Sequence, residues 1–246
     1  NKPWINVGKM HNRGIDASLD YHQKIGQVDV TARANFTYAH NTILDNDQPE
    51  WEYAYQNRIG QSNWQTFGLV ADGLFQSQEE IDAWPTQKFG EVKPGDIRYL
   101  DINGDGVVDD YDKKPIGFPD VPAISYGFGA SVRWKGIDVS VFFQGVDNVN
   151  FFINNSYTQP FIANKTRHSN VFADLYDNYW TEDNRDAKNP SLTIGSNTNN
   201  NKATTFWMDD GRYIRLKNEE DLLTRELPGY PEYKQKVKFR LIPFIW

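Results

Sequence analysis

The chain of 246 residues contains no cysteine, so disulfide bonds and thiolate metal sites are excluded. It also lacks an excess of positive charge. The formal net charge of −7 argues against a nucleic-acid partner, which would require a basic stripe. No apolar run approaches the roughly 20 residues of a membrane-spanning helix, and the first residues show no signal-peptide pattern. These absences leave membrane contact through β-strands open, because such strands give a much weaker sequence signal.

Motifs typical of enzyme active sites are missing as well. The sequence has no serine elbow, no phosphate-binding glycine loop and no zinc motif. Its four histidines share no metal or catalytic spacing: His11, His22, His40 and His168. Pairs of acidic residues are too numerous to single out the two carboxylates of a glycosidase. A hydrolase is therefore the weakest of the functional hypotheses.

Aromatic side chains are abundant, at 15% of the residues, which is typical of an all-β protein. Two segments alternate with the period of two expected of β-strands, residues 15–22 and 28–38. The second has one apolar face of Val28, Val30, Ala32, Ala34, Phe36 and Tyr38 and an opposite face of Asp29, Thr31, Arg33, Asn35 and Thr37. We expect a hairpin that turns near residues 23–27.

A second hairpin is predicted over residues 124–144, with its turn at Lys135–Gly136. Two long polar segments without alternation, residues 41–122 and 147–203, follow the two hairpins. Each holds one predicted helix, the first opened by the capping box Ser77–Glu80 and the second near residues 170–180. Further strands are expected at residues 213–217 and 236–246. Short turns at one end and very long loops at the other favour a transmembrane barrel over a soluble sandwich, which stays open as the alternative.

Residues 101–112 have the spacing of an EF-hand-type calcium loop, with glycine at position 6. The predicted ligands of a structural Ca²⁺ are the side chains of Asp101, Asn103, Asp105, Asp109 and Asp112 and the carbonyl of Val107. Position 12 is an aspartate rather than the longer glutamate, and Pro94 and Pro115 exclude closely flanking helices. The alternative is a solvated Asp/Gly turn that binds no ion.

At this point the sequence resembles the SusC/RagA family of TonB-linked outer-membrane proteins. The resemblance rests on separate stretches in the family's order, which cover most of residues 4–218: Asn6–Gly14, Asn35–Asn41, Ala71–Ser77, Gly95–Gly106, Tyr126–Gly129, Gly136–Gly145, Tyr179–Asn184 and Tyr213–Asn218. After Asn218 the pattern departs from the family, as if a hairpin were missing, so residues 219–246 carry little of it.

The resemblance implies an all-β fold in which residues 1–246 form an antiparallel transmembrane β-barrel segment, the C-terminal strands of a large plugged barrel. Segments 41–122 and 147–203 would be long extracellular loops with short helices. It implies import of an oligosaccharide or peptide across the outer membrane of a Gram-negative bacterium, without enzymatic activity. The implied partners are a SusD-like lipoprotein lid, the lipid bilayer, and TonB acting through a plug region outside this chain.

Four aromatic residues of the first long loop are candidates for stacking on a substrate: Trp51, Tyr53, Tyr55 and Trp64. Such residues equally pack a loop against itself. The competing hypothesis for the whole chain is a soluble, calcium-stiffened carbohydrate-binding β-domain. The two differ in one observable, because the importer exposes Val28, Val30, Phe36, Val139 and Val141 to lipid, whereas the soluble domain buries them in a dry core.

Overall fold

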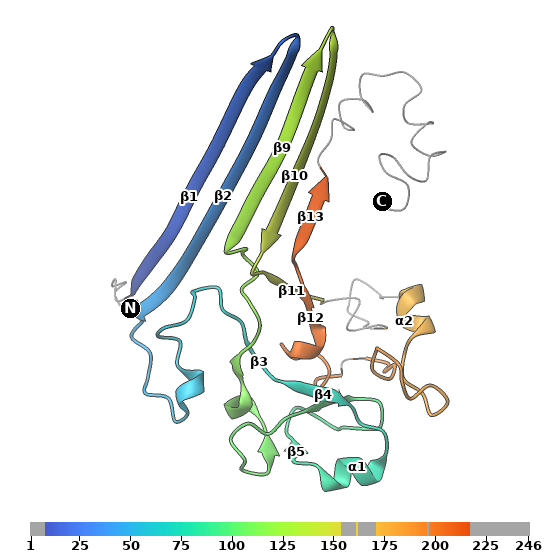
Figure 1. The fold of residues 1–246 in the computed structure, drawn as a ribbon. Coiled ribbons are helices and arrows are strands. Elements are labelled where there is room, and N and C mark those ends of the chain that lie inside the picture. Colours follow the sequence, from blue (N-terminus) through green and yellow to red (C-terminus); the bar gives the residue numbers. More distant parts are fainter. Residues whose placement is uncertain (1–7, 154–160, 162–170, 196, 217–246) are drawn as a thin grey trace. The chain divides into compact units, whose positions relative to one another are not determined.

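The computed structural model describes residues 8–153, 161, 171–195 and 197–216, and these fall into two compact units (Figure 1). The sheet unit comprises residues 15–38, 124–146 and 213 onward. The loop unit comprises the residues up to 14 together with 39–123 and 147–212. The predicted strand over residues 236–246 lies outside the described residues.

A single antiparallel sheet of five strands runs through the sheet unit, in the order β1-β2-β9-β10-β13 (Figure 1). Its strands are β1 (Lys9–Ile25), β2 (Val28–Asp45), β9 (Ile124–Trp134), β10 (Ile137–Asp147) and β13 (Tyr213–Leu216). The predicted strands are thus confirmed, but the first hairpin is longer than its alternation indicates. It begins at Lys9 and continues to Asp45.

Two-residue turns close both hairpins, Gly26–Gln27 and Lys135–Gly136. Lys135 and Gly136 both have positive φ, 47° and 85°, as in the type I′ turn whose twist matches that of paired strands. The second turn is the predicted one. The first is tighter than the predicted span of residues 23–27.

The register between β2 and β9 separates apolar from polar side chains. Val28 lies opposite Trp134, and Phe36 lies opposite Tyr126, on one face. Asp29 lies opposite Arg133 on the other face. Because side chains alternate along a strand, each face keeps its character along the whole pair.

The apolar face of the sheet is uncovered in the described residues. None of Val28, Val30, Phe36, Val139 and Val141 is buried, and the Val139 side chain is 59% exposed. The polar face carries the ion pairs Arg33–Asp20 (3.1 Å) and Arg133–Asp138 (2.9 Å). The sheet therefore exposes apolar side chains on one face and charged side chains on the other.

Short elements make up the loop unit. Two-stranded pairs join β3 (Phe67–Gly68) with β8 (Lys114–Pro115), β4 (Ala71–Leu74) with β6 (Ile97–Tyr99), β5 (Thr86–Gln87) with β7 (Val107–Val108), and β11 (Asn150–Phe152) with β12 (Met208–Asp210). The helices are α1 (Gln78–Ala83), α2 (Ala173–Asp177) and the 3₁₀ turns η1 (Ala54–Gln56), η2 (Asp110–Asp112) and η3 (Thr205–Trp207). Across the described ranges, no helix has the length and apolar character needed to span a membrane.

One half of the predicted capping box at the start of α1 is present. Ser77 Oγ accepts a hydrogen bond from the Glu80 amide (3.3 Å), an amide that the first helical turn leaves without a partner. Glu80 Oε2 accepts from the Gln76 amide (2.6 Å), one residue before the N-cap, rather than from the N-cap amide that a capping box requires. The helix ends before Pro85, as predicted. The second predicted helix is shorter than expected and covers only α2.

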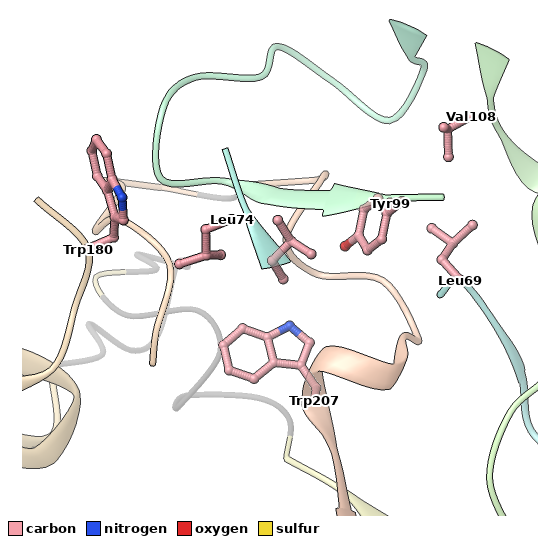
Figure 2. Packing of buried hydrophobic residues seen from close by; sticks show 7 residues of the cluster. Leu69, Leu74, Tyr99, Val108, Trp180 and Trp207 are labelled. Atoms are coloured by element: carbon pink, nitrogen blue, oxygen red, sulfur yellow. The ribbon is translucent and has the colours of Figure 1, made fainter. Parts of the chain in front are cut away.

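The hydrophobic core of the loop unit draws on both long loops (Figure 2). Trp180 of the second loop and Trp207, which follows that loop, cluster with Leu69, Leu74 and Tyr99 of the first. Ile97 and Val108 complete the cluster. Two segments that are distant in sequence therefore fold as one unit.

Candidate functional site

The predicted calcium loop folds around its own backbone amides. Asp101 accepts hydrogen bonds from Gly104 N (2.7 Å) and Gly106 N (2.8 Å), one on each carboxylate oxygen. Both glycines have positive φ, 77° and 84°, which a residue with a side chain adopts only at a cost. Asp101 thus fixes the tight turn that the spacing of the motif predicts.

Asp112 closes the other end of the loop from a fully buried position. Its carboxylate accepts from Ile102 N and Asp109 N, both at 2.7 Å. Asp109 in turn accepts from Tyr111 N (2.9 Å), which makes a reciprocal cap on η2. A buried carboxylate needs such donors, because an ionised group without partners is costly in the interior.

The six predicted ligands share one loop, and its carboxylates are engaged in hydrogen bonds and ion pairs. Asp105 accepts from Val107 N (2.8 Å) and Asn103 Nδ2 (3.0 Å), and Asp109 pairs with Lys88 Nζ (3.2 Å). Within the described part of the chain, no three or more His, Cys, Asp or Glu side chains are grouped to hold a metal ion. Calcium binding therefore stays a prediction, and it would require some of these carboxylate oxygens to turn toward the ion.

Two of the predicted substrate aromatics lie against this loop. Tyr53 Oη accepts from Asn103 Nδ2 (3.2 Å), and the Tyr53 and Tyr55 rings stack with centroids 5.4 Å apart. Tyr55 Oη donates to the Tyr111 carbonyl (2.7 Å). Burial, and then the negative charge of Asp112, raises the pKa of Tyr55 to about 12, so this phenol stays a neutral donor. Tyr53 and Tyr55 therefore pack against the loop of residues 101–112, and their contact with a substrate stays a prediction.

The other two aromatics are exposed and lie outside this cluster. Trp64 is at the surface, and Trp51 lines a shallow cavity of about 320 Å³. The remaining lining residues are Gln48, Pro49, Glu50, Ala54, Asn57 and Ile59. Trp51 therefore lines a formed cavity that a small ligand could reach.

Two of the stretches that carry the family resemblance, Ala71–Ser77 and Gly95–Gly106, form part of the interior of the loop unit. Arg98, from Gly95–Gly106, binds Asp72 (2.8 Å) and Glu80, and its guanidinium lies 4.5 Å from the centre of the Trp84 ring. Trp84 Nε1 donates to the Tyr99 carbonyl (2.9 Å). These contacts hold α1 on the pair of β4 and β6, so the motif residues here act in packing.

Sequence reasoning missed one polar cluster. Residues 197–201 read as a low-complexity asparagine run, which suggests a solvated loop, but Asn199 and Asn200 are buried and bonded to residues of the first long loop. The only local signal is the high density of amide side chains, and their partner Asp96 lies about a hundred residues earlier.

Comparison with known proteins gives two kinds of relative. No protein-family model matches the chain. The chain is 27% identical over 227 residues to TonB-dependent receptor P3 of Formosa agariphila, and 26% identical over 226 residues to TonB-dependent receptor P26 of the same organism. The matches cover 87% and 86% of this chain but 21% and 22% of those receptors. The chain thus spans about a fifth of the length of the curated relatives it matches.

Solved structures share the fold. The RagAB peptide transporter aligns with a TM-score of 0.57 at 23% identity, over 86% of this chain and 22% of that one. The RagAB peptide importer in its closed-closed state gives a TM-score of 0.57 at 21% identity. The chain is therefore similar in sequence to part of the TonB-dependent receptors and shares its fold with part of the RagAB peptide transporter.

Proposed function

We propose that this chain forms barrel wall and outer loops of an outer-membrane importer, as the C-terminal part of its barrel. The observation that carries the proposal is the two-sided sheet. Val139 and its neighbours expose an apolar face, and Arg33, Asp20, Arg133 and Asp138 pair on the opposite face. A sheet between hydrocarbon and a wet lumen needs this division.

The energetics favour this orientation. A charged side chain on the lipid side of such a wall costs roughly 2–4 kcal/mol at the bilayer midplane, whereas a lumen-facing charge remains solvated. A soluble carbohydrate-binding domain would instead have to cover the apolar face. In the described residues nothing buries it.

The relatives support the rest of the proposal. Two are TonB-dependent receptors, and the structural neighbour is named a peptide transporter. We therefore infer uptake of an oligosaccharide or peptide with a lipoprotein lid, driven by TonB through a plug outside this chain, with no bond chemistry in the barrel. Residues 41–122 and 147–203 would face the outside of the cell.

The proposed barrel wall can be tested by labelling single cysteines with one reagent that dissolves in lipid and one that stays in water. Because the chain has no cysteine, Val139→Cys and Ser140→Cys provide single probes on opposite faces of β10. In outer membranes, a lipid-soluble maleimide should label the Val139 variant and a membrane-impermeant one should not. The reverse preference is expected at position 140. Equal access of the impermeant reagent to both positions would refute the wall and favour the soluble domain.

We also propose that the loop of residues 101–112 binds Ca²⁺ after its carboxylates exchange some amide partners for the ion. Its support is the ligand spacing and the aromatic neighbours Tyr53 and Tyr55. Terbium, a luminescent stand-in for calcium, should be sensitised by these tyrosines and displaced by Ca²⁺. Asp105→Asn should weaken that signal, while Asp120→Asn outside the loop should not. Absence of sensitised emission from the wild-type protein would identify a cation-free turn.

A further inference from the structure

The segment of residues 197–204, here called the strap, lies inside the loop unit although five of its residues are asparagine or lysine. Asn199 and Thr204 are fully buried, and Asn200 nearly so. Burying an amide side chain is unfavourable unless hydrogen bonds replace its water. The strap must therefore be held by specific partners.

Asp96 is the first of these partners. Its fully buried carboxylate accepts hydrogen bonds from Asn197 Nδ2 (2.8 Å) and Asn200 Nδ2 (2.9 Å) on one oxygen. The other oxygen accepts from Lys93 N (3.0 Å). Hydrogen bonds to an ionised acceptor are stronger than those between neutral groups. Two of the three donors belong to the strap, so the carboxylate ties it to the first long loop.

The backbone of the first loop provides the next set of bonds. Asn200 Oδ1 accepts from Ile97 N (3.0 Å), and Asn199 Nδ2 donates to the Ile97 carbonyl (2.9 Å). Asn199 Oδ1 accepts from Gln87 Nε2 (2.7 Å), and Tyr99 Oη donates to the Asn199 carbonyl (2.7 Å). The asparagines thus provide for β6 the hydrogen bonds that a neighbouring strand would otherwise make.

The far end of the strap continues the contact. Leu69 N donates to the Ala203 carbonyl (2.9 Å), and Thr205 N donates to the Leu69 carbonyl (3.0 Å). A Cβ at Gly68 would lie 2.5 Å from the Ala203 oxygen, so a side chain there would push the strap away. Backbone approach this close requires the two segments to keep one relative position.

We propose that the strap, through its hydrogen bonds to Asp96, forms a latch. This latch makes the two long loops move as one body. A rearrangement of either loop, whether produced by a ligand or by a partner, must then displace the other or open the latch. This inference does not depend on what the protein transports.

The test compares two adjacent asparagines in the intact protein. Asn200→Ala removes the donor to Asp96 and the acceptor of the Ile97 amide, whereas Asn201→Ala removes an amide that has no hydrogen-bond partner in the described residues. Leaving a buried polar group unsatisfied costs enough to change an opening equilibrium by roughly ten- to a hundredfold. Hydrogen exchange should accelerate by that factor in Asn200→Ala and by less than about twofold in Asn201→Ala.

If the latch couples the two long loops, the same hydrogen-exchange experiment must show a second effect. In Asn200→Ala, exchange must accelerate together in residues 197–207 and in residues 87–99, because the latch holds both sides. Faster exchange in the strap alone, or equal effects of the two alanine variants, would overturn the proposal.

A cysteine pair keeps the test decisive if Asn200→Ala folds poorly. An added Cβ at Gly90 would lie 3.8 Å from Thr198 Cβ, which matches the usual separation in a disulfide. In the otherwise wild-type protein with Gly90→Cys and Thr198→Cys, oxidation should lock the strap and slow exchange in residues 197–207 and 87–99 relative to the reduced form. Backbone strain at Gly90 (φ +149°) is the same in the oxidised and reduced forms and cancels in the comparison. Failure of the oxidised pair to slow exchange on the first-loop side would show that no latch is present.

Discussion

The two units of this chain are stabilised in opposite ways. Among the described residues, all of the buried hydrophobic ones belong to the loop unit, including Leu69, Phe75 and Trp207. The described part of the sheet unit has none, although its strands are the most regular part of the chain. The loop unit thus has its own hydrophobic core, whereas the described sheet is held by backbone hydrogen bonds between strands and has two exposed faces. The difference shows that regular secondary structure and a hydrophobic core need not coincide in one region.

A matched pair of leucines should show the largest difference. Leu69 is fully buried in the loop unit, and Leu19 is 62% exposed on β1. Leu69→Ala should cost about 2–5 kcal/mol of loop-unit stability, since it leaves a cavity, whereas Leu19→Ala should stay within about 0.5 kcal/mol. Urea unfolding followed by the fluorescence of the buried tryptophans measures both. Similar losses would mean that the sheet contributes to the same core.

The faces of the sheet should differ by a comparable amount in a bilayer. Val139→Arg places a charge on the apolar face and should cost roughly 2–4 kcal/mol if that face meets the bilayer midplane. Ser140→Arg, one residue away on the polar face, should be nearly neutral. Folding yield in lipid vesicles compares the two variants. Equal tolerance of both arginines would remove the distinction between the faces.

The buried carboxylate of the loop unit should give a smaller, pH-dependent effect. Burial raises the pKa of Asp96 above its usual value, against the opposing influence of its hydrogen bonds to Lys93 and the strap asparagines. The charged or titratable groups that act with it are Lys93 and Tyr99.

Because the folded-state pKa is the higher one, the contribution of Asp96 to stability is fully present below its unfolded pKa and is lost as pH rises through the folded pKa. The stability of wild type relative to Asp96→Asn should therefore fall with rising pH across that window. Denaturation at a series of pH values gives the difference. A flat difference, or one that rises with pH, would contradict the assignment.

The smallest effect is expected from the ion pairs. Arg133 and Asp138 are largely exposed on the sheet, so Asp138→Asn should cost about 0–1 kcal/mol and less at high salt. Arg98 is mostly buried in the loop unit, and Asp72→Asn should cost more because it removes a partner from a sheltered guanidinium. Thermal melts at two salt concentrations separate the cases. An exposed pair that matched the sheltered one would argue for a covered polar face.

Local patterns made half of this architecture predictable. Strand alternation in β2 and β9 and the N-cap at Ser77 depend on neighbours within a few residues, and the structure confirms them. The ends of the first hairpin were underestimated because residues 9–14 and 41–45 do not alternate clearly.

The loop unit resisted sequence reasoning for a physical reason. Its strands β3, β5, β7 and β8 have two residues each, which is too short for any periodicity. Its polar cluster joins Asp96 to Asn200, 104 positions later, and no local pattern records such a contact. The spacing of residues 101–112 predicted the turn correctly, yet not that its carboxylates would bind amides of the same loop.

The outer edge of β1 has a practical consequence. In the described sheet this strand of 17 residues is hydrogen-bonded on one side only. An open strand edge of that length is a template for another chain. Expressed alone, the segment should therefore self-associate edge to edge and precipitate, and a neighbouring strand supplied in trans should keep it dispersed.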